Sequence, residues 1–266
     1  MEKLLTYMKT VGSSSIQRIQ LQHRLGLVQA FNIEKGMRVL EIGCGQGDTT
    51  VALADAVGET GFVMAIDIAG RDYGKPITLG EATDFIKSSP IGNRISFDLE
   101  ADFLTMKIDE AYDVAILSHC LWYFQEPATL LSYLKRLKKV AKRICIAEWD
   151  LEWTKPEQLA HFYSASILAI YAEQFEDEGN IQNIFHKEQL KDMLKESDWN
   201  LVDSKNVDAS FLQDGKWEVD YAISVREKFN HSPVKIQTLI QSYYALLEKA
   251  SNKNVQSLNS IVLIAN

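Results

Sequence analysis

The chain has 266 residues, of which 46% are hydrophobic and 24% are charged, which are ordinary proportions for a globular protein. Its formal net charge of −8 repels a phosphate backbone and argues against unaided binding to DNA or RNA. The chain lacks any run of about 18 apolar residues, so we expect no membrane span.

The three cysteines, Cys44, Cys120 and Cys145, lie far apart in apolar surroundings. They are odd in number and no two have the spacing of metal ligands, so we predict neither a disulfide framework nor a metal site. The N-terminus is too polar for a signal peptide, and we therefore expect a cytoplasmic protein.

The first 31 residues are predicted to be helical. Apolar residues recur near helical spacing between positions 16 and 25, and the three serines at 13–15 are suitable N-caps. We expect the segment 1–31 to form a helical lid over a binding site.

From residue 37 onward, short apolar strands alternate with helices. Strands are predicted at residues 37–42, 61–67, 94–97, 112–117 and 143–148. Helices are predicted at 49–57, from the capping-box sequence at 78–81, and at 127–140. This alternation is typical of a parallel sheet that is covered by helices on both faces.

After residue 149 the alternation stops. Residues 154–157 have capping-box spacing, and Pro156 fits a helix start, so we interpret 151–186 as a helical insertion after the fifth strand. The remaining predicted elements are helices at 186–197 and 232–249 and strands at 199–207 and 260–264.

These elements predict a single α/β domain over residues 1–266, a doubly wound and mostly parallel sheet of seven strands with helices on both faces. Its predicted parts are the N-terminal helical lid (1–31), a cofactor-binding core (32–150), the helical insertion (151–186) and a C-terminal part of the core (187–266).

The central sequence signal is the turn Glu41-Ile42-Gly43-Cys44-Gly45-Gln46-Gly47, which lies between the first strand and the next helix. Its glycines let the backbone approach a ligand closely, and the following helix offers free N–H groups. In open α/β sheets this turn is where nucleotides bind. Asp48 follows the turn and suits a cofactor that has no phosphate but carries ammonium and sulfonium groups.

Residues 39–47 resemble motif I of class I S-adenosylmethionine-dependent methyltransferases, and the likeness extends over roughly residues 36–150. The resemblance implies S-adenosylmethionine as cofactor. It places Asp67 on the ribose hydroxyls, Asp102 near the adenine amino group and Phe103 beside the adenine ring. The further cofactor-binding residues that it implies are Glu41, Gly43, Cys44, Gly45, Gly47, Ile68 and Ser118.

In this family methyl transfer is an in-line displacement, for which the protein mainly aligns the reactants in a water-poor cavity. A lid that encloses the site favours a small-molecule acceptor, and we expect O- or N-methylation, which can need a base. His119, which follows the fourth strand, is the first candidate and His161 the second. For each of them the alternative is a purely packing role.

Aromatic residues follow the fourth and fifth strands, in loops that are expected to line the mouth of the site. They suit a planar, apolar or cationic acceptor. The predicted substrate contacts are Trp122, Tyr123, Trp149 and Trp153, and the alternative is that these rings only bury the ends of the sheet.

Two other functions fit part of the same pattern. An NAD(P)-dependent oxidoreductase would also place Asp67 on a ribose, but such enzymes favour G-x-G-x-x-G, and we recognise no Tyr-x-x-x-Lys pair. A non-catalytic S-adenosylmethionine-binding protein would keep the glycine turn without turnover.

Overall fold

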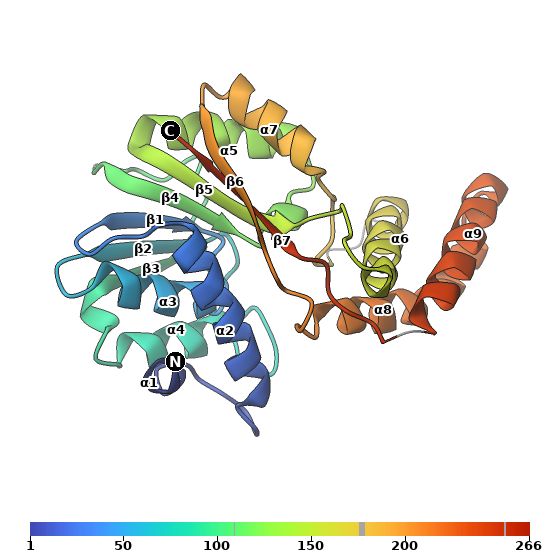
Figure 1. Ribbon diagram of the computed structural model, residues 1–266, viewed down its shortest axis with the longest axis horizontal. Coiled ribbons are helices and arrows are strands. Elements are labelled where there is room, and N and C mark those ends of the chain that lie inside the picture. The colour runs from blue at the N-terminus through green and yellow to red at the C-terminus, as the bar shows by residue number, and fades with distance from the viewer. Residues whose placement is uncertain (109, 176–178, 253) are drawn as a thin grey trace.

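The computed structural model describes residues 1–108, 110–175, 179–252 and 254–266, which form a seven-stranded sheet of order β3-β2-β1-β4-β5-β7-β6 (Figure 1). The strands β1 to β5 pair in parallel, and β7 is antiparallel to both β5 and β6. The predicted seven-stranded, mostly parallel sheet is therefore confirmed. The strands are β1 (Arg38–Ile42), β2 (Phe62–Asp67), β3 (Ile95–Leu99), β4 (Tyr112–Ser118), β5 (Ala141–Trp149), β6 (Leu201–Val207) and β7 (Ser260–Ala265).

Helices cover both faces of the sheet (Figure 1). One face carries α1 (Glu2–Leu5), α2 (Ser15–Ala30), α3 (Asp48–Val57) and α4 (Leu79–Lys87). The other face carries α5 (Pro127–Val140) and α7 (Lys187–Glu196). The predicted capping box at 78–81 is present, because the Thr78 hydroxyl accepts from the Glu81 N–H while the Glu81 carboxylate accepts from the Thr78 N–H.

The core consists of two apolar layers, one on each face of the sheet. Successive side chains of a strand point to opposite faces, so Val114 and Ile116 of β4 pack toward α2 and α3, whereas Ala115 and Leu117 pack toward α5. All four are fully buried, as expected for a central strand of a parallel sheet.

Three further helices form what we call the helical appendage: α6 (Leu159–Phe175), α8 (Asp214–Ser224) and α9 (Val234–Ser251). They pack against one another beyond the carboxyl ends of the parallel strands, at the right of Figure 1. The helix α6 contains most of the predicted insertion 151–186, of which residues 176–178 lie outside the described residues.

The helix α8 is not predicted from the sequence. Its apolar side chains point both inward and outward, because Val219 and Ala222 are buried while Trp217 and Tyr221 are exposed. The predicted start of α6 is also shifted. A 3₁₀ turn (Pro156–Gln158) comes first, and the side-chain oxygen of Gln158 accepts from the N–H groups of Thr154 and Lys155.

In the part of the chain that the structure covers, none of the helices combines the length and the apolar character needed to cross a membrane.

Candidate functional site

A cavity of about 630 Å³ opens at the carboxyl ends of β1, β2 and β4. The turn after β1 and the loop after β2 form one side of this cavity, and the residues after β4 form another. The strand order reverses between β1 and β4, which is where open α/β sheets bind their ligands. Of the predicted site residues, those that line the cavity are Gly43, Cys44, Gly45, Asp67, Ile68, Phe103, Ser118, His119 and Tyr123.

The turn requires glycines for two reasons, the backbone conformation and the lack of space for a side chain. Gly43, Gly45 and Gly47 have φ values of +70°, +53° and +86°, a backbone region that residues other than glycine rarely adopt. A Cβ atom on Gly43 would lie 2.7 Å from the Cβ of Cys120, and one on Gly47 would lie 2.6 Å from Ile86 Cδ1. Gly47 does not line the cavity as expected but caps α3 beneath it.

Asp67 is held at the rim of the cavity by the turn itself. Its Oδ2 atom accepts from the Gly45 N–H at 2.8 Å, and its Oδ1 atom accepts from the Ala69 N–H at 2.9 Å. A carboxylate has about four acceptor sites, so both oxygens can still accept from a ligand. Ile68 beside it is 69% exposed and lines the cavity.

Asp102 holds its own turn and does not line the cavity, although Phe103 does. The Asp102 carboxylate accepts from the Leu104 N–H at 2.9 Å and from the Thr105 hydroxyl at 3.2 Å. The structure therefore does not support the expected contact between Asp102 and adenine. The ring of Phe103 lies 5.2 Å from that of Tyr133 and is tilted by 50° to it, and Tyr133 also lines the cavity and extends its aromatic wall.

Glu41 lies beneath the glycine turn, outside the cavity lining. Its Oε2 atom accepts from the Thr50 hydroxyl at 2.6 Å, and burial raises the pKa of Glu41 to about 8. A direct contact with the cofactor is therefore not supported. Glu41 connects β1 to the first turns of α3.

Ser118 ends β4 at the cavity wall, and His119 follows it. The Ser118 hydroxyl is buried and has no hydrogen-bond partner among the described residues. His119 has a φ of +52°, which is uncommon for a residue other than glycine. Its Nε2 atom lies 2.9 Å from the Ser260 hydroxyl, and its Nδ1 atom lies 3.4 Å from the carboxylate of Glu148.

Both ring nitrogens of His119 therefore face buried protein groups and not the cavity. Burial also lowers the pKa of His119 well below its ordinary value, which keeps the ring neutral. This orientation argues against the predicted role of His119 as the base.

His161 lies in α6 and is fully buried outside the cavity. Its Nδ1 atom accepts from the Leu258 N–H at 2.8 Å, and its Nε2 atom lies 2.9 Å from a carboxylate oxygen of Glu218. These contacts connect α6 to α8 and to the segment before β7. The predicted base role of His161 is therefore not supported.

Three of the four predicted substrate contacts also lie elsewhere. Trp122 and Trp149 are buried and pack around His161, with ring centroids 6.3 and 4.9 Å away, and Trp153 is exposed outside the cavity. Tyr123 does line the cavity, and this residue is 49% exposed.

Asp48, which the sequence already linked to the cofactor, lines the cavity, and so do Arg24 and Tyr73, which were not predicted there. Arg24 projects from α2 and forms no ion pair with the residues that the structure describes. Burial raises the pKa of Asp48, and the positive charge of Arg24 opposes this effect. Arg24 lies three positions after the buried Leu21 and so shares its face of α2. A charged residue on that otherwise buried face was the signal that could have placed Arg24 in the site.

The predicted lid covers this cavity only in part. The N-terminal segment supplies Arg24, but no described residue of 151–186 lines the cavity. That segment lines a second groove instead, which has a volume of about 1280 Å³, lies against α6 and α9, and meets the first cavity at Gln125 and Glu126.

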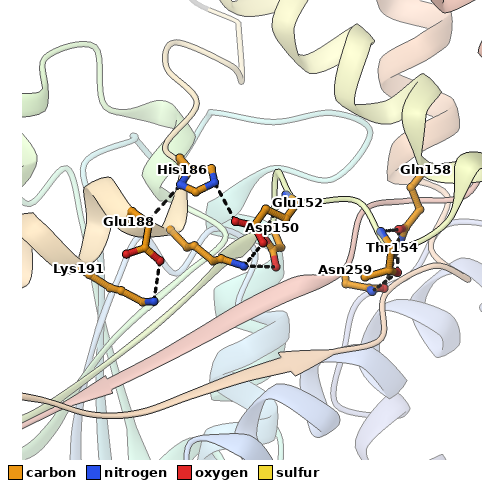
Figure 2. Close-up of polar contacts among 9 residues, drawn as sticks. Asp150, Glu152, Thr154, Gln158, His186, Glu188, Lys191 and Asn259 are labelled. Carbon is orange, nitrogen blue, oxygen red and sulfur yellow. Dashed lines mark hydrogen bonds and ion pairs between the residues drawn. The ribbon is translucent and has the colours of Figure 1, made fainter.

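Polar contacts fix one rim of this second groove (Figure 2). The Nε2 atom of His186 lies 3.1 Å from a carboxylate oxygen of Glu152, and Lys187 pairs with both Glu152 and Asp150. They join the start of α7 to the loop after β5. At the other side of Figure 2, Gln158 donates to the side chain of Asn259 and so connects the start of α6 to the residues before β7.

Comparisons with known proteins agree with this geometry. A family model described as a methyltransferase domain matches residues 17–204. The chain is 29% identical over 158 residues to methyltransferase phomM of Diaporthe leptostromiformis, in an alignment that covers 51% of this chain and 41% of that protein. The chain thus spans about two fifths of the length of that fungal relative.

Two other similar proteins match over more of their length. The chain is 25% identical over 218 residues to a demethylmenaquinone methyltransferase of Geobacillus kaustophilus, covering 77% of this chain and 88% of that protein. The crystal structure of a cyclopropane-fatty-acyl-phospholipid synthase-like protein from Lactobacillus casei has a TM-score of 0.90 and 29% identity, and covers 100% of this chain and 98% of that one.

Proposed function

Because the chain belongs to the methyltransferase-domain family, whose class I members use S-adenosylmethionine, we propose that it transfers the methyl group of this cofactor to a small aromatic acceptor. The observation that carries the proposal is the pairing of the Asp67 carboxylate with the Gly45 N–H, which places a hydrogen-bond acceptor for a ribose diol directly beside the glycine turn.

The cavity offers a matching group to each part of the cofactor. Asp67 would accept from the ribose hydroxyls, and the rings of Phe103 and Tyr133 would contact the adenine. At the other end, Arg24 would bind the α-carboxylate and Asp48 would face the ammonium group. This pair of opposite charges complements a zwitterion and disfavours a pyrophosphate, which an NAD(P)-dependent enzyme would have to bind.

The transfer itself needs alignment more than it needs a base. The bond from the methyl carbon to the sulfonium sulfur breaks as the bond to the acceptor atom forms, and the sulfur retains the electron pair. The ring nitrogens of His119 face away from the cavity, so we infer that the acceptor is already nucleophilic and releases its proton to water.

The rings of Tyr73 and Tyr123 support an aromatic acceptor. Both residues line the cavity and are about half exposed, at 50% and 49%, so a planar apolar molecule would cover surface that now faces water. The demethylmenaquinone methyltransferase of Geobacillus kaustophilus is a relative whose name refers to a quinone-type acceptor, which fits this class.

Two measurements test the proposal. Calorimetry should detect binding of S-adenosylhomocysteine and none of NADH, and selective binding of NADH would contradict it. Radiolabelled S-adenosylmethionine should label hydroquinones or phenols in preference to aliphatic amines. If the cofactor binds but no acceptor of any class is labelled, a non-catalytic binding protein becomes the better account.

A further inference from the structure

A chain of buried polar contacts runs from the cavity into the protein. Arg24 Nη1 lies 3.3 Å from His23 Nδ1, and His23 Nε2 lies 2.9 Å from the Ser260 hydroxyl. The same hydroxyl lies 2.9 Å from His119 Nε2, and His119 Nδ1 faces Glu148 at 3.4 Å. Side chains from α2, from the residue after β4 and from β7 thus meet at the Ser260 hydroxyl, and His119 in turn lies against Glu148 of β5.

The donors and acceptors in this chain have one consistent assignment. A guanidinium can only donate, so Nδ1 of His23 accepts from Arg24. The proton of the neutral ring is then on Nε2, which donates to Ser260. The Ser260 hydroxyl is free to donate to Nε2 of His119, whose own proton lies on Nδ1 and faces the carboxylate of Glu148.

The hydrogen-bond chain therefore has a direction, from Arg24 to His119, and Ser260 is its central link. His23 and Ser260 are 1% and 0% exposed, so water does not replace a missing partner. If Ser260 is removed, the Nε2 proton of His23 has no acceptor. Rotation of the His23 ring toward another hydrogen-bond acceptor then becomes favourable. This rotation also moves the Nδ1 atom that orients Arg24.

The backbone conformation of His119 is a second sign that the geometry of these polar contacts matters. A left-handed φ is unfavourable for a residue other than glycine and is retained where the surroundings require it. Here it brings Nε2 of His119 to Ser260 instead of to the cavity. The Ser260 hydroxyl comes from β7, outside the residues 17–204 that the family model matches.

We propose that Ser260 is a positioning residue of the cofactor site: through His23 it fixes the guanidinium of Arg24 where the carboxylate of the cofactor's amino-acid end binds. This inference rests on the proposed function, because it takes Arg24 as the carboxylate-binding residue.

The test compares two ligands on the full chain. S-adenosylhomocysteine carries the amino-acid end, whereas 5′-methylthioadenosine has the same adenosyl part without it. In Arg24→Ala, the dissociation constant of S-adenosylhomocysteine should rise about 10-fold to 100-fold, because a charge-assisted contact is lost, while that of 5′-methylthioadenosine should stay within about twofold. Ser260→Ala should show the same selectivity with a smaller rise of about 3-fold to 30-fold.

The matched control is Ser257→Ala. Ser257 is another fully buried serine, but its hydroxyl accepts from the Gly215 N–H and donates to the Leu212 carbonyl in the helical appendage region. It should lower stability without changing the ratio of the two dissociation constants. If Ser260→Ala affects both ligands equally, or affects neither, the positioning role is wrong.

A second pair of variants decides the question if Ser260→Ala does not fold. Asparagine at position 23 places its carbonyl oxygen near the site of Nδ1, whereas glutamine places its amide nitrogen near the site of Nε2. His23→Asn should therefore keep the affinity for S-adenosylhomocysteine better than His23→Gln, and equal affinities would overturn the inference. If Arg24→Ala leaves the ratio unchanged while S-adenosylhomocysteine still binds, the assignment of Arg24 fails but the methyltransferase function stands.

Discussion

The cavity and the helical appendage show two different ways of placing side chains. Around the cavity, the backbone positions the side chains. Gly43 and Gly45 have left-handed conformations, and the N–H of Gly45 holds Asp67 at the end of its strand. In the appendage, side chains do it, as His161 connects α6 to α8 and to Leu258. A change in the first region should therefore alter ligand binding, whereas a change in the second should mainly alter stability.

The largest effect is expected at Gly43. Gly43→Ala adds a positive-φ cost and a contact of 2.7 Å with Cys120, so the free energy of unfolding should fall by about 2–5 kcal/mol and S-adenosylhomocysteine binding should be lost. Gly45→Ala is the control, because its φ is also positive but its Cβ would meet nothing within 4 Å. Urea titration should give a loss of only about 1–2 kcal/mol there. Equal losses would show that space around Gly43 is not limiting.

His161→Ala tests the appendage side of the comparison. It removes a fully buried ring and leaves the Leu258 N–H and the Glu218 carboxylate without their partner, so unfolding should become easier by about 2–4 kcal/mol. Calorimetry at a temperature where the variant is folded should give an unchanged affinity for S-adenosylhomocysteine. A strong loss of affinity would instead mean that the two regions are coupled.

Asp67→Asn should affect ligand binding as well as stability. The amide retains one acceptor oxygen but not the charge, and its NH2 group cannot accept from the second backbone N–H, so affinity for S-adenosylhomocysteine should fall about 10-fold and the melting temperature should fall as well. Asp102→Asn is the matched comparison, since that carboxylate holds its own turn. It should cost stability and leave affinity within about threefold. The reverse result would return the ligand contact to Asp102.

The last prediction concerns pH and Glu41. Its pKa is about 8 in the fold and near 4.5 in the unfolded chain, so between these values the folded state binds more protons. Its contribution to stability is present below about pH 4.5 and is lost as the pH rises toward 8. Glu41→Gln removes this dependence and, without cofactor, should gain about 1 kcal/mol or more over wild type between pH 5 and pH 8. Parallel stability curves for the two proteins would contradict the raised pKa.

The sequence predicted those parts of the molecule that local patterns determine. The strand ends carrying Asp67 and Ser118 follow from the alternation of apolar strands and helices, and the turn follows from its glycines. The position of His119 was also predicted, but its orientation was not, because that depends on Ser260, which is 141 positions away along the chain. No local pattern carries that information.

The misplaced aromatic residues have a related cause. Trp122 and Trp149 follow strands, as ligand-contacting residues often do, but helix α6 with its His161 covers them. Whether a ring faces a ligand or another helix depends on packing between distant segments. Arg24 was missed for the converse reason, because a charged residue in an amphipathic helix ordinarily faces solvent.

The placement of β7 between β5 and β6 has a consequence for synthesis. On the ribosome, the five parallel strands are complete by residue 149, yet the edge of β5 has no partner until residues 260–265 have emerged. An open strand edge is a template for pairing with other chains. While more than a hundred further residues are synthesised, the nascent protein therefore has most of its sheet but an unpaired edge at β5. We expect this to be the stage at which aggregation is easiest and protection by a chaperone matters most.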